Sequence, residues 1–183
     1  NHFILPVGYK GNMIKNFINS NKIFKNLKID IIDTGRKTRI AKRIFLIKNK
    51  ITSKNFLLLN GDAIFDFNLK KIYQKHEKQK KDLTFIGCEV QLPYGTIGLV
   101  NNRIVSFDRN LTFDSVNVKG KKNFLAHVYS GMSIISKDLL KLNFKNYDHF
   151  EKKLYPRIIN NYNCQFEVFN GFWHSVDNIK DID

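Results

Sequence analysis

Residues 56–67 read FLLLNGDAIFDF, an apolar run that ends at Asn60, Gly61 and Asp62. A short apolar run bounded by turn residues is typical of a buried strand in an α/β sheet. In open sheets of this kind, ligands bind beyond the carboxyl ends of the strands, where the loops converge. We therefore expect Asp62 at a ligand-binding edge, with Gly61 leaving room for a ligand to approach the backbone closely.

A carboxylate at such an edge suits a hard divalent cation. Mg²⁺ typically takes one or two protein carboxylates together with phosphate oxygens and water. Asp177, in the stretch GFWHSVDN, is the best candidate for a second carboxylate. In the alternative interpretation, residues 60–62 are only a turn and Asp66 caps the following helix. Spacing alone leaves both interpretations open.

Apolar, β-rich runs alternate with amphipathic helical patterns along the chain. This alternation predicts a layered α/β domain with a largely parallel sheet. A Pro inside the last helical pattern predicts a kink or a break there. Strands are expected at 2–9, 27–33, 54–60, 82–90, 125–136 and 164–169, a hairpin at 95–107 around Asn101-Asn102, and helices at 12–19, 38–51, 68–80 (capped by Asn68) and 147–162 (interrupted at Pro156).

Length and composition predict one globular domain. The chain has 183 residues, of which 43% are hydrophobic, enough for a real core. The longest apolar runs are far below the roughly 18 to 20 residues that a membrane span needs, so no membrane partner is expected. Cys88 and Cys164 lack the C-x-x-C spacing of a zinc site or redox motif, which favours a reducing cytoplasm.

The net charge of +15 raises the hypothesis of nucleic-acid binding. Lysines occur in nearly every segment of the chain and are not gathered in one stretch. This distribution favours a solvated basic surface, and a nucleic-acid partner is not expected.

Seven stretches occur in the order, and at about the spacings, of those in sugar-1-phosphate nucleotidyltransferases. Among these enzymes the chain most resembles the glucose-1-phosphate cytidylyltransferases, and the resemblance runs over essentially the whole chain. The stretches are VGYKGNMIKNFI, IDIIDTG, FLLLNGDAIFDF, YGTIGLV with RIVSFDRN, VYSGMSIIS, FEKKLYPRI and GFWHSVDNIKDID.

The resemblance implies a Rossmann-like, mixed and mostly parallel sheet of the nucleotide-diphospho-sugar transferase type, similar to GT-A folds, in a single domain over residues 1–183. It implies transfer of a nucleotidyl group from a nucleoside triphosphate to a sugar 1-phosphate, which gives an NDP-sugar and pyrophosphate for polysaccharide biosynthesis. Asp62 and Asp177 are then the catalytic residues that hold Mg²⁺. CTP or GTP is the favoured nucleotide, and a homo-oligomer is left open.

The resemblance also implies residues that bind the substrates. Trp173 lies beside the second metal carboxylate in the family's G-F-W run, although it can equally be a core residue. Asp66 matches the second Asp of a G-D-x-x-x-D run, and capping or bracing the loop is its favoured role. The implied substrate-binding residues are Gly61, Tyr94, Gly95, Ser130 and Gly131.

The chain departs from the family pattern in three places. The G-G-x-G-T-R-L loop and the P-K-P-M run are not in this sequence, so we expect an N-terminally truncated fragment that is inactive alone. Lys37-Thr38 stands where relatives have a Gly-Gly pair near the nucleobase. Arg109 and Asn110 replace the Glu and Lys of F-x-E-K-P at the sugar-phosphate side. The alternative function is therefore a non-catalytic nucleotide- or sugar-binding module of the same fold.

Overall fold

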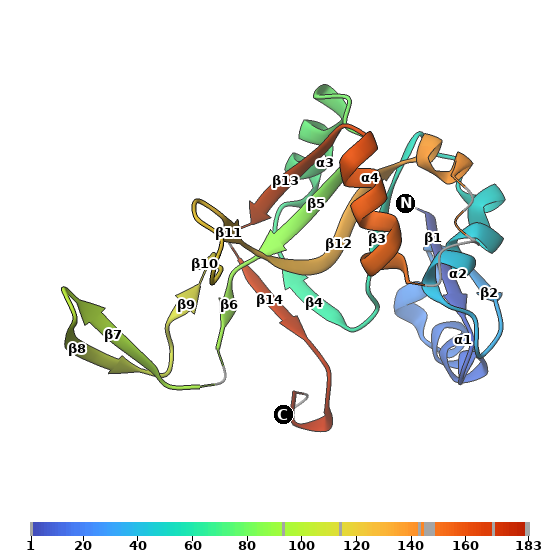
Figure 1. The fold of residues 1–183 in the computed structure, drawn as a ribbon. Coiled ribbons are helices and arrows are strands. Elements are labelled where there is room, and N and C mark those ends of the chain that lie inside the picture. Colours follow the sequence, from blue (N-terminus) through green and yellow to red (C-terminus); the bar gives the residue numbers. More distant parts are fainter. Residues whose placement is uncertain are drawn as a thin grey trace. The chain divides into compact units, whose positions relative to one another are not determined.

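The computed structural model describes residues 2–92, 94–113, 115–142, 144, 149–169 and 171–181 (Figure 1). The chain divides into two compact units. The first contains residues 1–56 and 136–162, and the second contains residues 57–135 and 163–183. The expectation of a single nucleotidyltransferase domain stays a prediction.

The first unit begins with a parallel β-α-β arrangement. Strand β1 (His2–Val7) pairs in parallel with β2 (Lys28–Asp33), and α1 (Gly11–Ser20) lies between them in sequence. A second helix, α2 (Ile40–Ile47), follows and buries Ala41, Ile44 and Ile47. These elements confirm the strands and helices predicted from apolar spacing, because residues three or four apart share one helix face.

The remainder of the first unit contains the interrupted helix. A π-helical turn (Phe150–Leu154) leads into α4 (Tyr155–Asn161). Pro156 lies in the first turn of α4, directly after the π-helical turn. The irregularity predicted at Pro156 appears as a change from π-helical to α-helical structure just before it, while residues 147 and 148 of that predicted helix lie outside the described residues.

A four-stranded mixed sheet forms the centre of the second unit, in the order β13-β5-β12-β3. Strand β13 (Cys164–Phe169) is parallel to β5 (Leu83–Cys88), whereas β12 (Val128–Ser136) is antiparallel to β5. β3 (Asn55–Leu59) is the fourth strand and starts in the first unit. The mixed sheet is as predicted, although its parallel part is smaller than the alternation of strands and helices suggested, because β12 reverses direction.

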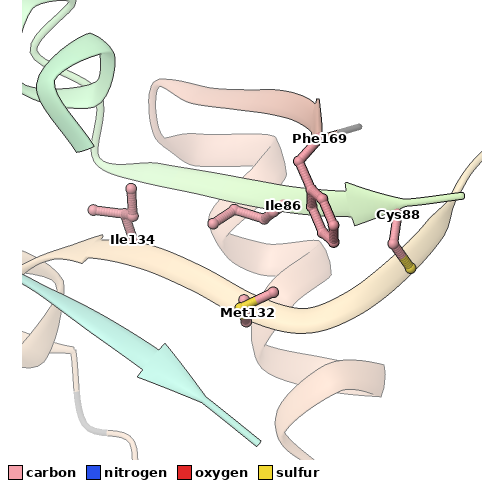
Figure 2. Close-up of a cluster of buried hydrophobic side chains, with 5 residues drawn as sticks. All are labelled: Ile86, Cys88, Met132, Ile134 and Phe169. Carbon is pink, nitrogen blue, oxygen red and sulfur yellow. The ribbon is translucent and has the colours of Figure 1, made fainter. Parts of the chain in front are cut away.

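The core of the second unit lies on one face of this sheet. Figure 2 shows its buried side chains on β5, β12 and β13: Ile86, Cys88, Met132, Ile134 and Phe169. Helix α3 (Leu69–Lys78) packs Leu69, Ile72 and Tyr73 against this cluster.

The N-cap of α3 decides between two sequence predictions. The Asn68 side chain accepts a hydrogen bond from the main-chain N–H of Lys71, which confirms Asn68 as the cap. Asp66 lies at the end of a strand, β4 (Ala63–Asp66), so the interpretation of Asp66 as the helix cap is wrong. An Asn side chain at the N-cap satisfies one of the free N–H groups of the first turn.

Several strands were not predicted from the sequence. β4 pairs antiparallel with β14 (Phe172–Ser175), and the two lie side by side in Figure 1.

The predicted hairpin is confirmed as β7 (Thr96–Val100) and β8 (Arg103–Asp108), with positive φ at Asn101 and Asn102. Two-residue strands complete the fold: β6 (Val90–Gln91), β9 (Thr112–Phe113), β10 (Val116–Asn117) and β11 (Leu125–Ala126). Among the described residues, no helix has the length and apolar character required to cross a membrane.

Candidate active site

The loop Asn60-Gly61-Asp62 joins β3 to β4 in the second unit. The main-chain N–H of Asn60 donates a hydrogen bond of 3.0 Å to the carbonyl of Gly131, which ties the start of the loop to β12. Asp62 itself is exposed. Its carboxylate is thus available to a ligand from solvent, while the backbone that carries it is anchored.

Asp177 comes to this loop through the pairing of β4 with β14. Ser175, the last residue of β14, pairs with Ala63, the first residue of β4. One residue further on, the main-chain N–H of Val176 donates a hydrogen bond of 2.8 Å to the carbonyl of Asp62. Asp177 follows directly and is exposed. The two carboxylates predicted from the sequence therefore lie on adjacent chain segments at one end of the β4–β14 ladder.

Asp181 organises the segment that carries Asp177. Its carboxylate accepts hydrogen bonds of 2.8 Å from the main-chain N–H groups of Asp177 and Asn178. The hydrogen bond from the main-chain N–H of Asn178 is the main cause that lowers the pKa of Asp181. The Ser175 hydroxyl also donates to the Asp177 carboxylate at 3.2 Å. Sequence reasoning missed Asp181, although an Asp-Asn-x-x-Asp spacing is a signal for carboxylate capping of main-chain N–H groups.

The donor set is compatible with Mg²⁺ but not with a site made wholly of protein ligands. Among the described residues there is no group of three or more His, Cys, Asp or Glu side chains positioned to hold a metal ion. Mg²⁺ needs only one or two carboxylates when phosphate oxygens and water complete its coordination. Asp62 and Asp177 match that requirement in number, type and exposure.

Gly61 lies in open space. A Cβ atom built on it would have no heavy atom within 4 Å, and its φ is outside the left-handed region. Neither packing nor backbone conformation within the chain therefore requires glycine at this position. The expectation that a ligand approaches the backbone here stays a prediction.

Ser130 and Gly131 form a bulge in β12 directly behind the loop. The pairing of β12 with β5 shifts register between Tyr129 and Met132. Gly131 has φ of +80°, and a Cβ on it would lie 2.9 Å from the amide nitrogen of the Asn60 side chain. Glycine is required here by both conformation and space.

Ser130 is buried, and its hydroxyl donates a hydrogen bond of 2.7 Å to the carbonyl of Ile86. The Trp173 indole N–H donates to the carbonyl of Ser130 at 2.9 Å, and the Trp173 ring packs against the apolar core cluster. The core interpretation of Trp173 thus has direct support. The role of Ser130 and Gly131 in substrate binding stays a prediction, with a structural role of the bulge now visible beside it.

Tyr94 and Gly95 lie at the base of the β7–β8 hairpin. Tyr94 is 74% exposed. A Cβ on Gly95 would lie 2.3 Å from the ring of Phe107, so the ring covers this glycine closely. No hydrogen bond within the described part of the chain joins Tyr94 or Gly95 to Asp62 or Asp177. Substrate contact by this pair also stays a prediction.

No protein-family model matches the chain. Individual relatives do match it. A glucose-1-phosphate adenylyltransferase large subunit of Zea mays is 25% identical over 80% of this chain and 33% of its own length. A D-glycero-α-D-manno-heptose 1-phosphate guanylyltransferase of Aneurinibacillus thermoaerophilus is 25% identical over 87% of this chain and 70% of its own length. A glucose-1-phosphate cytidylyltransferase of Bacillus subtilis (strain 168) is 27% identical over 63% of this chain and 53% of its own length.

The fold has solved counterparts. The crystal structure of HddC from Yersinia pseudotuberculosis superimposes with a TM-score of 0.64 at 20% identity, covering 98% of this chain and 74% of that protein. The same protein complexed with GMP-PN gives a TM-score of 0.63. The chain spans between a third and about 70% of the length of the first three relatives. The homologues of this chain are sugar-1-phosphate nucleotidyltransferases, and its fold is that of the nucleotide-diphospho-sugar transferases.

Proposed function

We propose that the protein to which this chain belongs transfers a nucleotidyl group from a nucleoside triphosphate to a sugar 1-phosphate and releases pyrophosphate. The observation that carries the proposal is the β4–β14 pairing, which brings Asp177 to the loop of Asp62. The relatives, whose names are those of enzymes that make NDP-sugars, support the same reaction.

The reaction joins two anions. An oxygen of the sugar 1-phosphate attacks the α-phosphorus in line, a new P–O bond forms, and the bond to pyrophosphate breaks. Repulsion between the phosphates opposes their approach, so the site must supply positioning and positive charge. Asp62 and Asp177 would hold Mg²⁺, which would supply positive charge to screen the phosphate oxygens.

The chain's own residues contribute positioning. The hydrogen bond from the main-chain N–H of Val176 to the carbonyl of Asp62 fixes the spacing of the two loops that carry Asp62 and Asp177. Asp181 holds the peptide of Asp177 in one orientation through its two main-chain hydrogen bonds. The open space at Gly61 allows a phosphate group to reach the backbone of the loop.

We propose CTP or GTP as the nucleotide, with a matching guanylyltransferase and a matching cytidylyltransferase in support. An adenylyltransferase also matches the chain, so ATP belongs in the panel of the test. The substrate-binding roles of Gly61, Tyr94, Gly95, Ser130 and Gly131 belong to the same proposal. We place the reaction in the cytoplasm because Cys88 and Cys164 are free thiols.

The test is pyrophosphate release by the full-length protein with Mg²⁺ and a panel of nucleoside triphosphates and sugar 1-phosphates. At least one pair should react. Asp62→Asn and Asp177→Asn should each lower turnover by at least about 100-fold, because loss of metal-based charge stabilisation costs several kcal/mol. Asp82→Asn is the control, since it removes a carboxylate that belongs to neither of these loops and accepts the main-chain N–H of Asn163. If no pair of substrates in the panel leads to pyrophosphate release, the proposal is contradicted.

A non-catalytic binding module is the second candidate. Arg109 and Asn110, which stand where the family has Glu and Lys, favour it. Such a module would bind a nucleotide or a sugar phosphate in calorimetry and release no pyrophosphate under any condition of the panel.

A further inference from the structure

A basic hollow of about 420 Å³ lies within the first unit, and none of its lining residues is assigned to the reaction. Four of its seven lining residues are lysines, whereas Lys and Arg together make up 31 of the 183 residues of the chain. The general basicity of the chain does not account for this concentration. The lining residues are Lys48, Asn49, Lys54, Lys137, Asp138, Leu140 and Lys141.

The backbone segments that carry these lysines are held in place by a hydrogen bond and by buried side chains. The main-chain N–H of Lys137 donates a hydrogen bond of 2.8 Å to the carbonyl of Lys54, which joins the two segments that carry them. Leu139 and Leu140 are buried and fix the 3₁₀ helix Lys137–Lys141. Because this backbone is already ordered, ligand binding costs less conformational entropy here than it would on a mobile loop.

Positive charge in the hollow exceeds negative charge. The lining contains four lysines and one carboxylate, that of Asp138, which pairs with Lys141 at 2.7 Å. The hydrogen bond from Lys141, and more weakly the charge of Lys54, lower the pKa of Asp138. The Lys48 ammonium lies over the Phe45 ring, 4.2 Å from its centroid. The salt bridges in the described part of the chain include neither Lys54 nor Lys137, so these two cations are available to an anionic ligand.

We propose that this hollow binds a small polyanion that carries two or more phosphate groups. Lysine is a common point-charge partner of phosphate, and several ammonium groups around one hollow match a ligand with several negative charges. The volume is that of a small-molecule site, which ranges from roughly 300 to 1,000 Å³. The proposal does not depend on the proposed function, because neither Asp62 nor Asp177 belongs to the lining.

The test is calorimetric titration of the protein with inorganic tripolyphosphate in Mg²⁺-free buffer at near-physiological salt. Tripolyphosphate should bind at least tenfold more tightly than orthophosphate. The double variant Lys54→Gln/Lys137→Gln should weaken tripolyphosphate binding at least tenfold. The control Lys15→Gln/Lys25→Gln removes the same charge from exposed positions of the same unit and should change affinity less than twofold.

Three outcomes would overturn the proposal. The first is no binding of tripolyphosphate by the unsubstituted protein. The second is equal weakening by the two double variants, which would assign the binding to overall charge. The third is competition by nucleic acid. If a single-stranded oligonucleotide displaces bound tripolyphosphate at a lower concentration than free tripolyphosphate does, the lysines belong to a nucleic-acid surface. Pyrophosphate release, measured separately, tests the proposed function without reference to these residues.

Discussion

The main-chain N–H of Asp177 donates a hydrogen bond of 2.8 Å to the carboxylate of Asp181, four residues further along the chain. The same carboxylate accepts the main-chain and side-chain N–H groups of Asn178, each at 2.8 Å. Three donors thus converge on one side chain and fix the backbone that presents Asp177. Asp181 is therefore a positioning residue for the candidate metal ligand.

The first prediction concerns Asp181→Asn. The amide keeps one acceptor oxygen but loses the negative charge that makes these hydrogen bonds strong. We expect the Mg²⁺ concentration for half-maximal activity of the full-length protein to rise about tenfold, the lower end of the range for residues that orient a metal ligand. The control Asp82→Asn should leave it unchanged. An unaltered Mg²⁺ requirement in Asp181→Asn would contradict a positioning role.

The second prediction concerns Gly61→Ala. A Cβ meets no protein atom here and the backbone is not left-handed. The free energy of unfolding of the variant should therefore equal that of the unsubstituted protein or exceed it by up to about 1 kcal/mol, because alanine restricts the unfolded chain. Pyrophosphate release should nevertheless fall at least tenfold if a phosphate approaches this backbone. Steady-state kinetics and urea unfolding measure the two effects separately. Full activity in the variant would show that no ligand uses the open space.

Gly131→Ala is a comparison for stability alone, because Gly131 is itself a proposed substrate-binding residue. This residue has φ of +80° and Asn60 close by, so a Cβ imposes strain as well as a clash. We expect a loss of stability of about 1 to 2 kcal/mol, the usual cost of a left-handed conformation for a residue with a side chain. Equal stability of the two glycine variants would contradict a folding role of the bulge.

The third prediction concerns pH and His76. Burial lowers the pKa of His76, whose Nδ1 lies 2.7 Å from the Thr84 hydroxyl. As pH falls below about 6.5, unfolded chains take up a proton that the native state excludes, so the free energy of unfolding decreases by at most about 1.4 kcal/mol per pH unit. Urea unfolding at pH 7.5 and 5.5 should show this decrease.

In His76→Gln that component of the pH dependence should disappear, because glutamine does not titrate. The exposed His127 offers a control, and His127→Gln should keep the pH dependence of the unsubstituted protein. The same slope in His76→Gln as in the unsubstituted protein would assign the acid sensitivity to other groups.

The fourth prediction concerns the two thiols. Burial raises the pKa of Cys88 to about 11 and also raises the pKa of Cys164. Since the thiolate is the reactive form, the native protein should react slowly with a disulfide reagent at pH 8, and both thiols should react rapidly in urea. Cys164→Ser isolates Cys88 for the measurement. Rapid modification of Cys88 in the folded protein would mean that the core in Figure 2 opens readily.

The elements that depend on neighbours within a few residues could be predicted from the sequence. The spacing of Ile40, Ile44 and Ile47 predicts α2, and the three residues lie on one helix. Asn68 caps α3 as expected, because the N–H it satisfies is only three residues away. The Asn101-Asn102 turn is equally local, since asparagine tolerates positive φ.

The resemblance to sugar-1-phosphate nucleotidyltransferases, and with it the candidates Asp62 and Asp177, also came from ordered motifs in the sequence, and the homologues that match the chain are enzymes of that kind. Those motifs did not reveal Asp181 or the Asn60–Gly131 hydrogen bond. Each of these contacts depends on a backbone orientation that no residue type specifies alone.

The pairing of β4 with β14 and the bulge at Ser130 and Gly131 became known from the three-dimensional structure. AIFD and FWHS are four-residue segments with too few residues for a clear alternation of apolar and polar side chains. Such a strand exists because a partner distant in sequence satisfies its N–H and C=O groups. The position of Asp177 beside the Asp62 loop follows from that distant partner, and local sequence therefore could not predict it.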